Sequence, residues 1–238
     1  MATTKVYFVT GASRGIGLSL VTSLVGKGQT VIATARDPDN ASQLKDLASQ
    51  HAGRLHIVKL DVNQPSTFVS TTDQIKKAGF PHLDVVINNA GVLGEVKPLG
   101  EVTEQVLRDV YQTNTIGPFL LTQELKKTGL IGQPGTVIVN ITSVLGSIGA
   151  NIFPGWTGFE YRASKAALNI LTKHLDTALA KDNVAVVAIH PGYVMTEMNK
   201  GDGHITVEES VKGILSVLES GKDLHGTFYN YDGQPLPW

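Results

Sequence analysis

The chain has 238 residues, of which 42% are apolar and 17% charged, a balance typical of a folded protein with a large core and not of a disordered chain. Its 20 basic and 21 acidic side chains nearly cancel, which argues against nucleic acid or an anionic membrane as partner and favours a small molecule. It contains no cysteine, which excludes disulfides and thiolate metal sites. No apolar run reaches the roughly 18 residues of a membrane span, and the first residues lack the apolar stretch of a secretory leader, so we expect a cytoplasmic protein.

Short β-branched runs alternate with longer helical patterns along the whole chain. The expected strands cover residues 5–10, 30–34, 55–60, 84–87, 136–140, 184–190 and 227–230. Between them, the expected helices cover residues 16–26, 65–78, 103–127, 161–181 and 207–220. This alternation predicts an α/β fold, a Rossmann-like doubly wound parallel sheet of about seven strands with helices on both faces. Because no repeat, low-complexity tract or charged linker interrupts it, we expect residues 1–238 to form one domain rather than two.

A glycine-rich turn follows the first expected strand and precedes the first expected helix. Glycines let a backbone turn sharply against a pyrophosphate, whose charge then meets free amides at the helix N-terminus. The spacing here is Gly-x-x-x-Gly-x-Gly, not the commoner Gly-x-Gly-x-x-Gly. An ordinary glycine-rich connection is the alternative, but the position after the first strand favours a dinucleotide site. Its expected contacts are Gly11, Ser13, Arg14, Gly15, Ile16 and Gly17.

The end of the second expected strand should decide which dinucleotide binds, because the adenosine ribose lies there. Ala35 offers no carboxylate to a free 2′-hydroxyl, whereas Arg36 and Arg14 would both reach a 2′-phosphate. This pattern predicts NADP(H) as the cofactor. Two alternatives stay open, in which Arg36 is a solvated loop cation or Asp37 turns in to hold the ribose.

Three polar residues have the types and positions needed for carbonyl chemistry. Tyr161 and Lys165 stand four residues apart on an expected helix and share one face, and Ser143 follows the strand at 136–140, at the crevice edge of the sheet. A carbonyl accepting hydride needs a proton donor, and an ammonium beside a phenol lowers the phenol pKa toward a useful value. Ser143 would hold the substrate oxygen. The Tyr-x-x-x-Lys spacing alone arises by chance on many helices, but its combination with the glycine turn predicts a hydride-transfer site.

Taken in order along the chain, these motifs resemble those of the short-chain dehydrogenase/reductase family over nearly the full length. The resemblance implies that Ser143, Tyr161 and Lys165 are catalytic and that Asn114 holds a water in a proton relay to the lysine. It also implies that the Asn-Asn-Ala-Gly stretch at 88–91 lines the cofactor channel and that the segment beginning with Pro191 and Gly192 contacts the nicotinamide. The cofactor contacts implied in this way are Asp61, Val62, Asn88, Ala90, Gly91, Tyr161, Lys165, Pro191, Gly192, Val194 and Thr196.

Two departures from the usual family pattern concern the substrate side. Ser143 lies 18 residues before Tyr161, several more than is common, and the extra segment 151–160 carries Phe153, Trp156 and Phe159, which we expect at the substrate pocket. The lid over the substrate should be reduced to residues 197–206. Together with the chain length and the tail from Gly226 onward, these features make the sequence resemble the branch of the family that contains bacterial C-factor and the insect carbonyl reductase Sniffer.

The favoured function is an NADP(H)-dependent carbonyl reductase or alcohol dehydrogenase acting on an apolar or aromatic ketone or aldehyde. An NADP(H)-binding regulatory protein with little catalysis is the alternative, although Tyr161 and Lys165 are both retained. An epimerase or dehydratase is disfavoured because too few residues follow Thr196 for a second substrate domain. No histidine spacing indicates a metal site, and the resemblance implies a homo-oligomer, a dimer or a tetramer.

Overall fold

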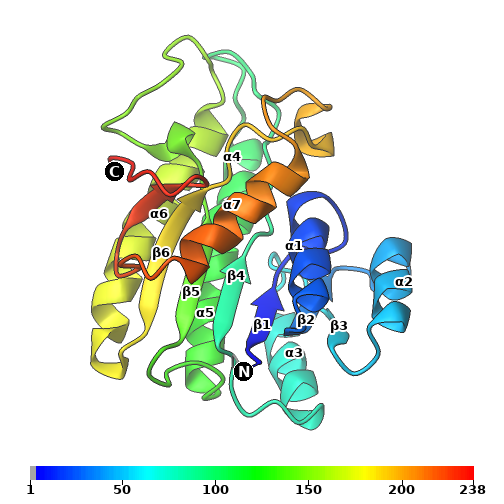
Figure 1. The fold of residues 1–238 in the computed structure, drawn as a ribbon. Coiled ribbons are helices and arrows are strands. Elements are labelled where there is room, and N and C mark those ends of the chain that lie inside the picture. Colours follow the sequence, from blue (N-terminus) through cyan, green and yellow to red (C-terminus); the bar gives the residue numbers. More distant parts are fainter. Residues whose placement is uncertain (1–3) are drawn as a thin grey trace.

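Seven β-branched, apolar segments of the chain pair into a single parallel sheet in the computed structural model, which describes residues 4–238 (Figure 1). The first three residues of the expected domain lie outside the described part. The strand order is β3-β2-β1-β4-β5-β6-β7, so the chain winds outward from β1 in one direction and then from β4 in the other. The strands are β1 (Val6–Val9), β2 (Thr30–Ala35), β3 (Leu55–Lys59), β4 (Val85–Asn88), β5 (Val137–Ile141), β6 (Ala185–His190) and β7 (Phe228–Asn230). The expected doubly wound fold is confirmed.

Helices cover both faces of this sheet. They are α1 (Gly15–Gly26), α2 (Ser42–Gln50), α3 (Ser66–Lys77), α4 (Glu104–Tyr111), α5 (Gly117–Lys127), α6 (Phe159–Leu179) and α7 (Val207–Glu219). One core lies between the sheet and α1, α2 and α7, and a second lies between the opposite face and α3, α5 and the end of α6. Figure 1 shows α1 and α7 side by side over the first face. Because strands covered on both faces meet no water, their apolar runs are continuous rather than alternating.

Two elements differ from the sequence-based expectation. The sequence pattern does not predict helix α2, because this helix buries one side chain, Leu44, and so has little apolar periodicity. The helix expected at 103–127 is interrupted by a π-helical turn at Gln112–Ile116, which separates α4 from α5. A π-turn leaves the apolar spacing on either side nearly intact, so periodicity does not reveal it, yet such turns are frequent at functional sites.

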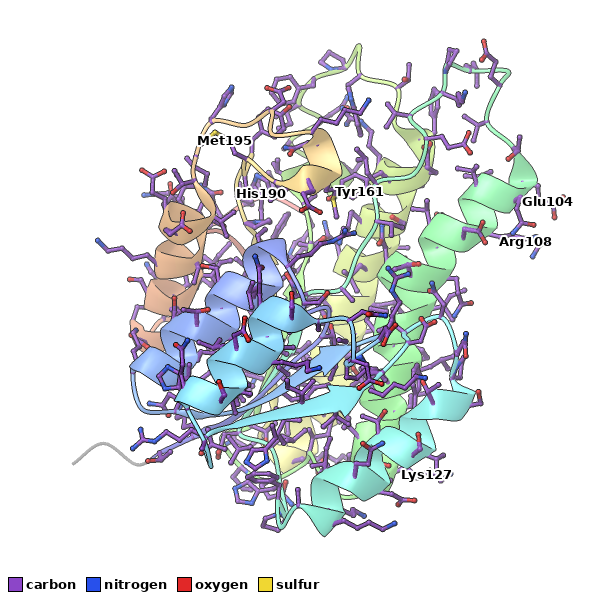
Figure 2. All side chains as sticks on the ribbon, turned by 90° about the vertical axis from the view of Figure 1, so that its right-hand side faces the viewer. Glu104, Arg108, Lys127, Tyr161, His190 and Met195 are labelled. Atoms are coloured by element: carbon purple, nitrogen blue, oxygen red, sulfur yellow. The ribbon has the colours of Figure 1, made fainter. Side chains whose placement is uncertain are left out.

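The carboxyl ends of the strands meet at one edge of the sheet, and the polar residues of interest follow them there. The turn after β1 carries the glycines, Ser143 follows β5, and His190 ends β6. Figure 2 shows Tyr161 and His190 at this end of the molecule and Lys127 at the opposite end. In a doubly wound sheet this edge is where ligands bind. None of the helices within residues 4–238 combines the length and hydropathy required to cross a bilayer.

Candidate active site

Two neighbouring cavities open at the carboxyl edge of the sheet. The first, a cleft of about 290 Å³, runs along the glycine turn and the ends of β2, β3 and β4. The second, of about 610 Å³, lies between the 151–160 segment and the residues that follow β6. Both cavities are lined by Tyr161, Pro191 and Thr196. They therefore meet at the tyrosine, and we refer to them below as the cofactor cleft and the substrate pocket.

The glycine turn is built to bring backbone amides close to a ligand. Arg14 is the extended N-cap of α1 and makes no side-chain cap, and no acidic residue occupies the first turn of the helix. Gly15 has φ +56°, and a Cβ added there would have no neighbour within 4 Å, so the backbone borders the open cleft. At Gly17 a Cβ would collide with the carbonyl oxygen of Gly11. The free helix N-terminus and this exposed backbone fit the pyrophosphate of a dinucleotide.

Asn89 holds the glycine turn in this shape. Its side-chain amide donates to the carbonyls of Thr10 (3.0 Å) and Gly11 (3.2 Å). In return, the Thr10 hydroxyl accepts the backbone N–H groups of Asn89 (3.0 Å) and Ala90 (3.1 Å). The segment after β4 is thus fastened to the segment after β1, and both line the cofactor cleft.

The adenosine end of the cleft carries two arginines. Arg36 lines the cleft directly after β2, and Arg14 lines it from the glycine turn, where it pairs with Glu197 at 3.0 Å. Asp37, the alternative ribose ligand, does not line the cleft. Its carboxylate accepts a hydrogen bond from Asn40 (2.6 Å), which lowers the pKa of Asp37. The arginines therefore supply the positive charge at this end, with Glu197 as the counter-ion of Arg14. One carboxylate, that of Asp61, also lines the cleft after β3 and accepts the N–H of Asn63 (3.0 Å).

Ser143, Tyr161 and Lys165 surround the junction of the two cavities. Ser143 lines the substrate pocket, Lys165 lines the cofactor cleft, and Tyr161 lines both. The Lys165 ammonium donates to the carbonyl of Ile141 (2.9 Å) and lies 5.7 Å from the centre of the Tyr161 ring. Ser143 caps a short 3₁₀ turn at Val144–Gly146, which fixes its hydroxyl at the end of β5. The Ser143 hydroxyl, the Tyr161 phenol and the Lys165 ammonium thus follow one another from the substrate pocket to the cofactor cleft.

Burial determines the protonation of this group. It raises the pKa of Tyr161 to about 12, and hydrogen bonding to Ser143 offsets only part of that effect. It lowers the pKa of Lys165 to about 8. The sequence pattern predicts that Lys165 lowers the Tyr161 pKa, whereas in the structure desolvation of the phenolate is the largest influence on that pKa and raises it. At neutral pH the tyrosine therefore holds its proton.

The π-turn places Asn114 under the loop after β4. The buried Asn114 side-chain amide donates to the carbonyl of Val92 (2.9 Å) and to the hydroxyl of Ser164 (3.0 Å), and its oxygen accepts the N–H of Val92 (2.9 Å). Ser164 in turn donates to the carbonyl of Tyr161 (2.8 Å). Asn114 thereby connects the loop that borders the cofactor cleft with the helix that carries the tyrosine and lysine.

Comparison with known proteins places this arrangement in a family. A family model described as short chain dehydrogenase matches residues 5–204. The chain belongs to the short-chain dehydrogenase family. It is therefore an oxidoreductase by family, as the motifs indicated.

Several members of the family are similar over most of the chain. An NADPH-bound carbonyl reductase from chicken fatty liver has 35% sequence identity and a TM-score of 0.90, covering 100% of both chains. The carbonyl reductase Sniffer of D. melanogaster has 32% identity and a TM-score of 0.91, covering 99% of this chain and 100% of its own. Farnesol dehydrogenase of Aedes aegypti is 34% identical over 223 residues, 91% of this chain and 85% of that protein. The similarity to Sniffer confirms the expected branch of the family.

Most of the residues predicted to contact the cofactor or the substrate line the corresponding cavity, and a few do not. The cofactor cleft is lined by Gly11, Ser13, Arg14, Gly15, Ile16, Gly17, Arg36, Asp61, Val62, Ala90, Gly91, Tyr161, Lys165, Pro191 and Thr196. Gly192 and Val194 line the substrate pocket instead. Asn88 lines neither cavity, because its side chain is buried in the sheet and donates to Asn140 (2.9 Å). Phe153 and Trp156 line the substrate pocket, whereas Phe159 does not and is 39% exposed on the surface of α6.

Several residues that line the substrate pocket are not among those predicted from the sequence. His190, Asn230 and Tyr231 line the substrate pocket at the ends of β6 and β7. The rule that ligands bind at carboxyl strand ends would have found these three. Leu93 and Val96 line the same pocket from an irregular loop that has no periodicity to indicate its place. Within residues 4–238, no cluster of three or more histidine, aspartate and glutamate side chains could hold a metal ion.

Proposed function

We propose that the protein is an NADP(H)-dependent carbonyl reductase or alcohol dehydrogenase that uses Tyr161 as its proton donor. The observation that carries this proposal is the position of Tyr161 at the junction of the two cavities, with Ser143 on the substrate side and Lys165 on the cofactor side. A hydride passing from one cavity to the other arrives beside the phenol. The nicotinamide, when bound, supplies that hydride.

The chain's own residues bind the carbonyl and deliver the proton. Ser143 donates a hydrogen bond to the substrate oxygen and holds it beside Tyr161. Tyr161, protonated because its pKa is about 12, transfers its proton to that oxygen as negative charge develops there. The Lys165 ammonium near the ring stabilises the phenolate left behind. Asn114 positions the loop and helix on which this group stands.

NADP(H) is the proposed cofactor because Arg36 and Arg14 line the adenosine end of the cleft, whereas Asp37, the alternative ribose ligand, does not. Arg36 and Arg14 would pair with a 2′-phosphate, and Asp37 is engaged with Asn40. The chicken carbonyl reductase, at 35% identity, is an NADPH-bound structure, which supports the same choice. The cofactor contacts proposed here are the residues of the cofactor cleft named above.

The proposed substrate is an apolar or aromatic ketone or aldehyde, or the corresponding alcohol. Side chains such as Phe153, Trp156, Val144 and Ile205 line the pocket, and an unpaired carboxylate would lose its hydration there. The name of farnesol dehydrogenase denotes an apolar alcohol as the substrate of that relative. We further propose that residues 1–238 act as one NADP-binding domain, in a cytoplasmic homo-oligomer.

A substrate panel tests this proposal. Aromatic and aliphatic ketones, aldehydes and quinones are offered with NADPH, and the loss of NADPH absorbance is followed. We expect turnover with aromatic or long apolar carbonyls and little with sugar phosphates or acyl thioesters. Tight NADPH binding without turnover on any carbonyl or alcohol would instead favour the regulatory alternative.

A further inference from the structure

The two residues on either side of Tyr161 are charged, and each reaches the backbone of a different wall of the substrate pocket. Glu160 points toward the loop after β4, and Arg162 points toward the 151–160 segment. The motifs single out only the tyrosine and the lysine of this helix and assign no role to Glu160 or Arg162. The contacts of each residue show what it does.

Glu160 fastens the wall formed by the loop after β4. Its side chain is fully buried, and one carboxylate oxygen accepts the backbone N–H groups of Glu95 (3.0 Å) and Val96 (2.7 Å). Val96 lines the pocket and has φ +53°, a left-handed conformation that is unusual for a β-branched residue. Such a conformation persists only where surrounding contacts impose it, and Glu160 supplies two of them.

Arg162 fastens a second wall, the 151–160 segment, in a similar way. Its guanidinium donates from one nitrogen to the carbonyls of Ile152 (2.7 Å) and Phe153 (2.6 Å). Phe153 also lines the pocket and is also left-handed, with φ +51°. The same guanidinium lies 5.5 Å from the centre of the Trp156 ring, within the range of a cation–π interaction.

Trp156 connects this wall to the reacting group. Its ring meets the ring of Tyr161 edge to face, with the centres 6.3 Å apart and the planes at 89°. Both rings line the substrate pocket. The position of Trp156 therefore affects both the width of the pocket and the packing of the phenol, and Arg162 contacts Trp156 and the backbone just before it.

We propose that Glu160 and Arg162 are positioning residues that fix two of the walls of the substrate pocket relative to Tyr161 and so determine which carbonyl substrates fit. Because the two side chains leave the helix directly before and after the tyrosine, a shift of either wall relative to the phenol would break one of these contacts. The statement about substrates rests on the proposed function, whereas the statement about wall geometry does not.

The test uses Arg162→Met, which keeps an unbranched apolar stem but removes the charge and the donors. It is made in a Trp238→Phe background, so that Trp156 is the one remaining tryptophan. We expect a red shift of Trp156 emission and easier quenching by acrylamide, because the ring loses its partner. We also expect kcat/KM for a bulky aromatic ketone to fall roughly 10- to 100-fold relative to that for a small aldehyde, the scale of a misplaced substrate. NADPH affinity should be retained.

Further variants separate positioning from general damage. Arg162→Lys, which keeps the charge on a shorter stem, should recover part of the emission and of the selectivity. Glu160→Gln keeps an acceptor oxygen and should remain close to wild type, whereas Glu160→Leu should lose selectivity as Arg162→Met does. The exposed Arg54, at the opposite end of β3 from the cofactor cleft, provides the matched control Arg54→Met, which should change neither reading.

Two results would overturn the proposal. One is unchanged Trp156 emission together with an unchanged ratio of kcat/KM between bulky and small substrates in Arg162→Met. The other is a parallel loss of selectivity and NADPH binding in Arg162→Lys and Glu160→Gln, which would indicate collapse of the site. If the wild type reduces no carbonyl, the proposed function fails, and the emission of the Arg162 variants still decides the role of Arg162.

Discussion

At the scale of single residues, burial does more to tune this site than neighbouring charge does. Tyr161 and Lys165 lie in one apolar junction, and desolvation raises the pKa of the first to about 12 and lowers that of the second to about 8. Both shifts favour the less charged forms, as expected where water is excluded. The phenol of Tyr161 therefore keeps its proton at neutral pH.

Arg36 should carry much of the preference for NADPH over NADH. A hydrogen bond to a charged group contributes about 1.5–3 kcal/mol net, so Arg36→Ala should weaken NADPH binding by roughly 10- to 150-fold and leave NADH nearly unaffected. Fluorescence titration of the wild type and the variant with each cofactor measures this. Equal wild-type affinities for the two cofactors would make Arg36 a solvated cation.

His190 should make the folded protein sensitive to acid. Burial lowers its pKa to about 4, and nearby Lys165 acts in the same direction, against an opposing influence of Asp232. Because the folded-state pKa lies below the unfolded value of 6.5, the unfolded state binds the proton first, and stability falls as the pH drops from about 6.5 toward 4. His190→Gln should remove about 2 kcal/mol of the loss between pH 7 and pH 5, measured by urea unfolding at both values. An equal loss in both proteins would contradict this account.

At the scale of elements, the π-turn at Gln112–Ile116 carries Asn114, which connects the loop after β4 with α6 through hydrogen bonds to Val92 and Ser164. Asn114→Ala would remove the hydrogen bonds to both backbone groups of Val92, at a cost of about 0.5–1.5 kcal/mol for each bond. We expect a lower Tm and a lower kcat, followed by thermal unfolding and by steady-state kinetics. An unchanged Tm would mean that the loop holds its shape without Asn114.

The strands and the long helices were predictable from the sequence because a buried parallel sheet requires continuous β-branched runs, as in β6. The segment 151–160 was only partly predictable. Its aromatic residues indicated a pocket wall, but the placement of Phe159 depends on where α6 begins, and Phe159 is the first residue of that helix. The roles of Glu160 and Arg162 depend on left-handed backbone at Val96 and Phe153, which side-chain patterns do not encode.

At the scale of the whole molecule, exposed apolar side chains on the α5–α6 side match the homo-oligomer that the family resemblance implies. Ile170 of α6 is 55% exposed, and Ile116, the last residue of the π-turn before α5, is 40% exposed. We expect a dimer at micromolar concentration by analytical ultracentrifugation, and Ile170→Asp should shift it toward monomer by placing a charge in the interface. A wild type that sediments as a monomer would contradict this expectation.

The central claim is that Tyr161 supplies the proton to the substrate and that NADPH binding in the cofactor cleft does not depend on the Tyr161 hydroxyl. Single-turnover and steady-state rates of NADPH oxidation by Tyr161→Phe, together with its NADPH dissociation constant, test this claim most directly. Removing a general acid should lower turnover by about two to four orders of magnitude and leave NADPH affinity nearly unchanged, because the phenyl ring still fills the junction. Turnover close to that of the wild type would contradict the assignment of Tyr161 as the proton donor.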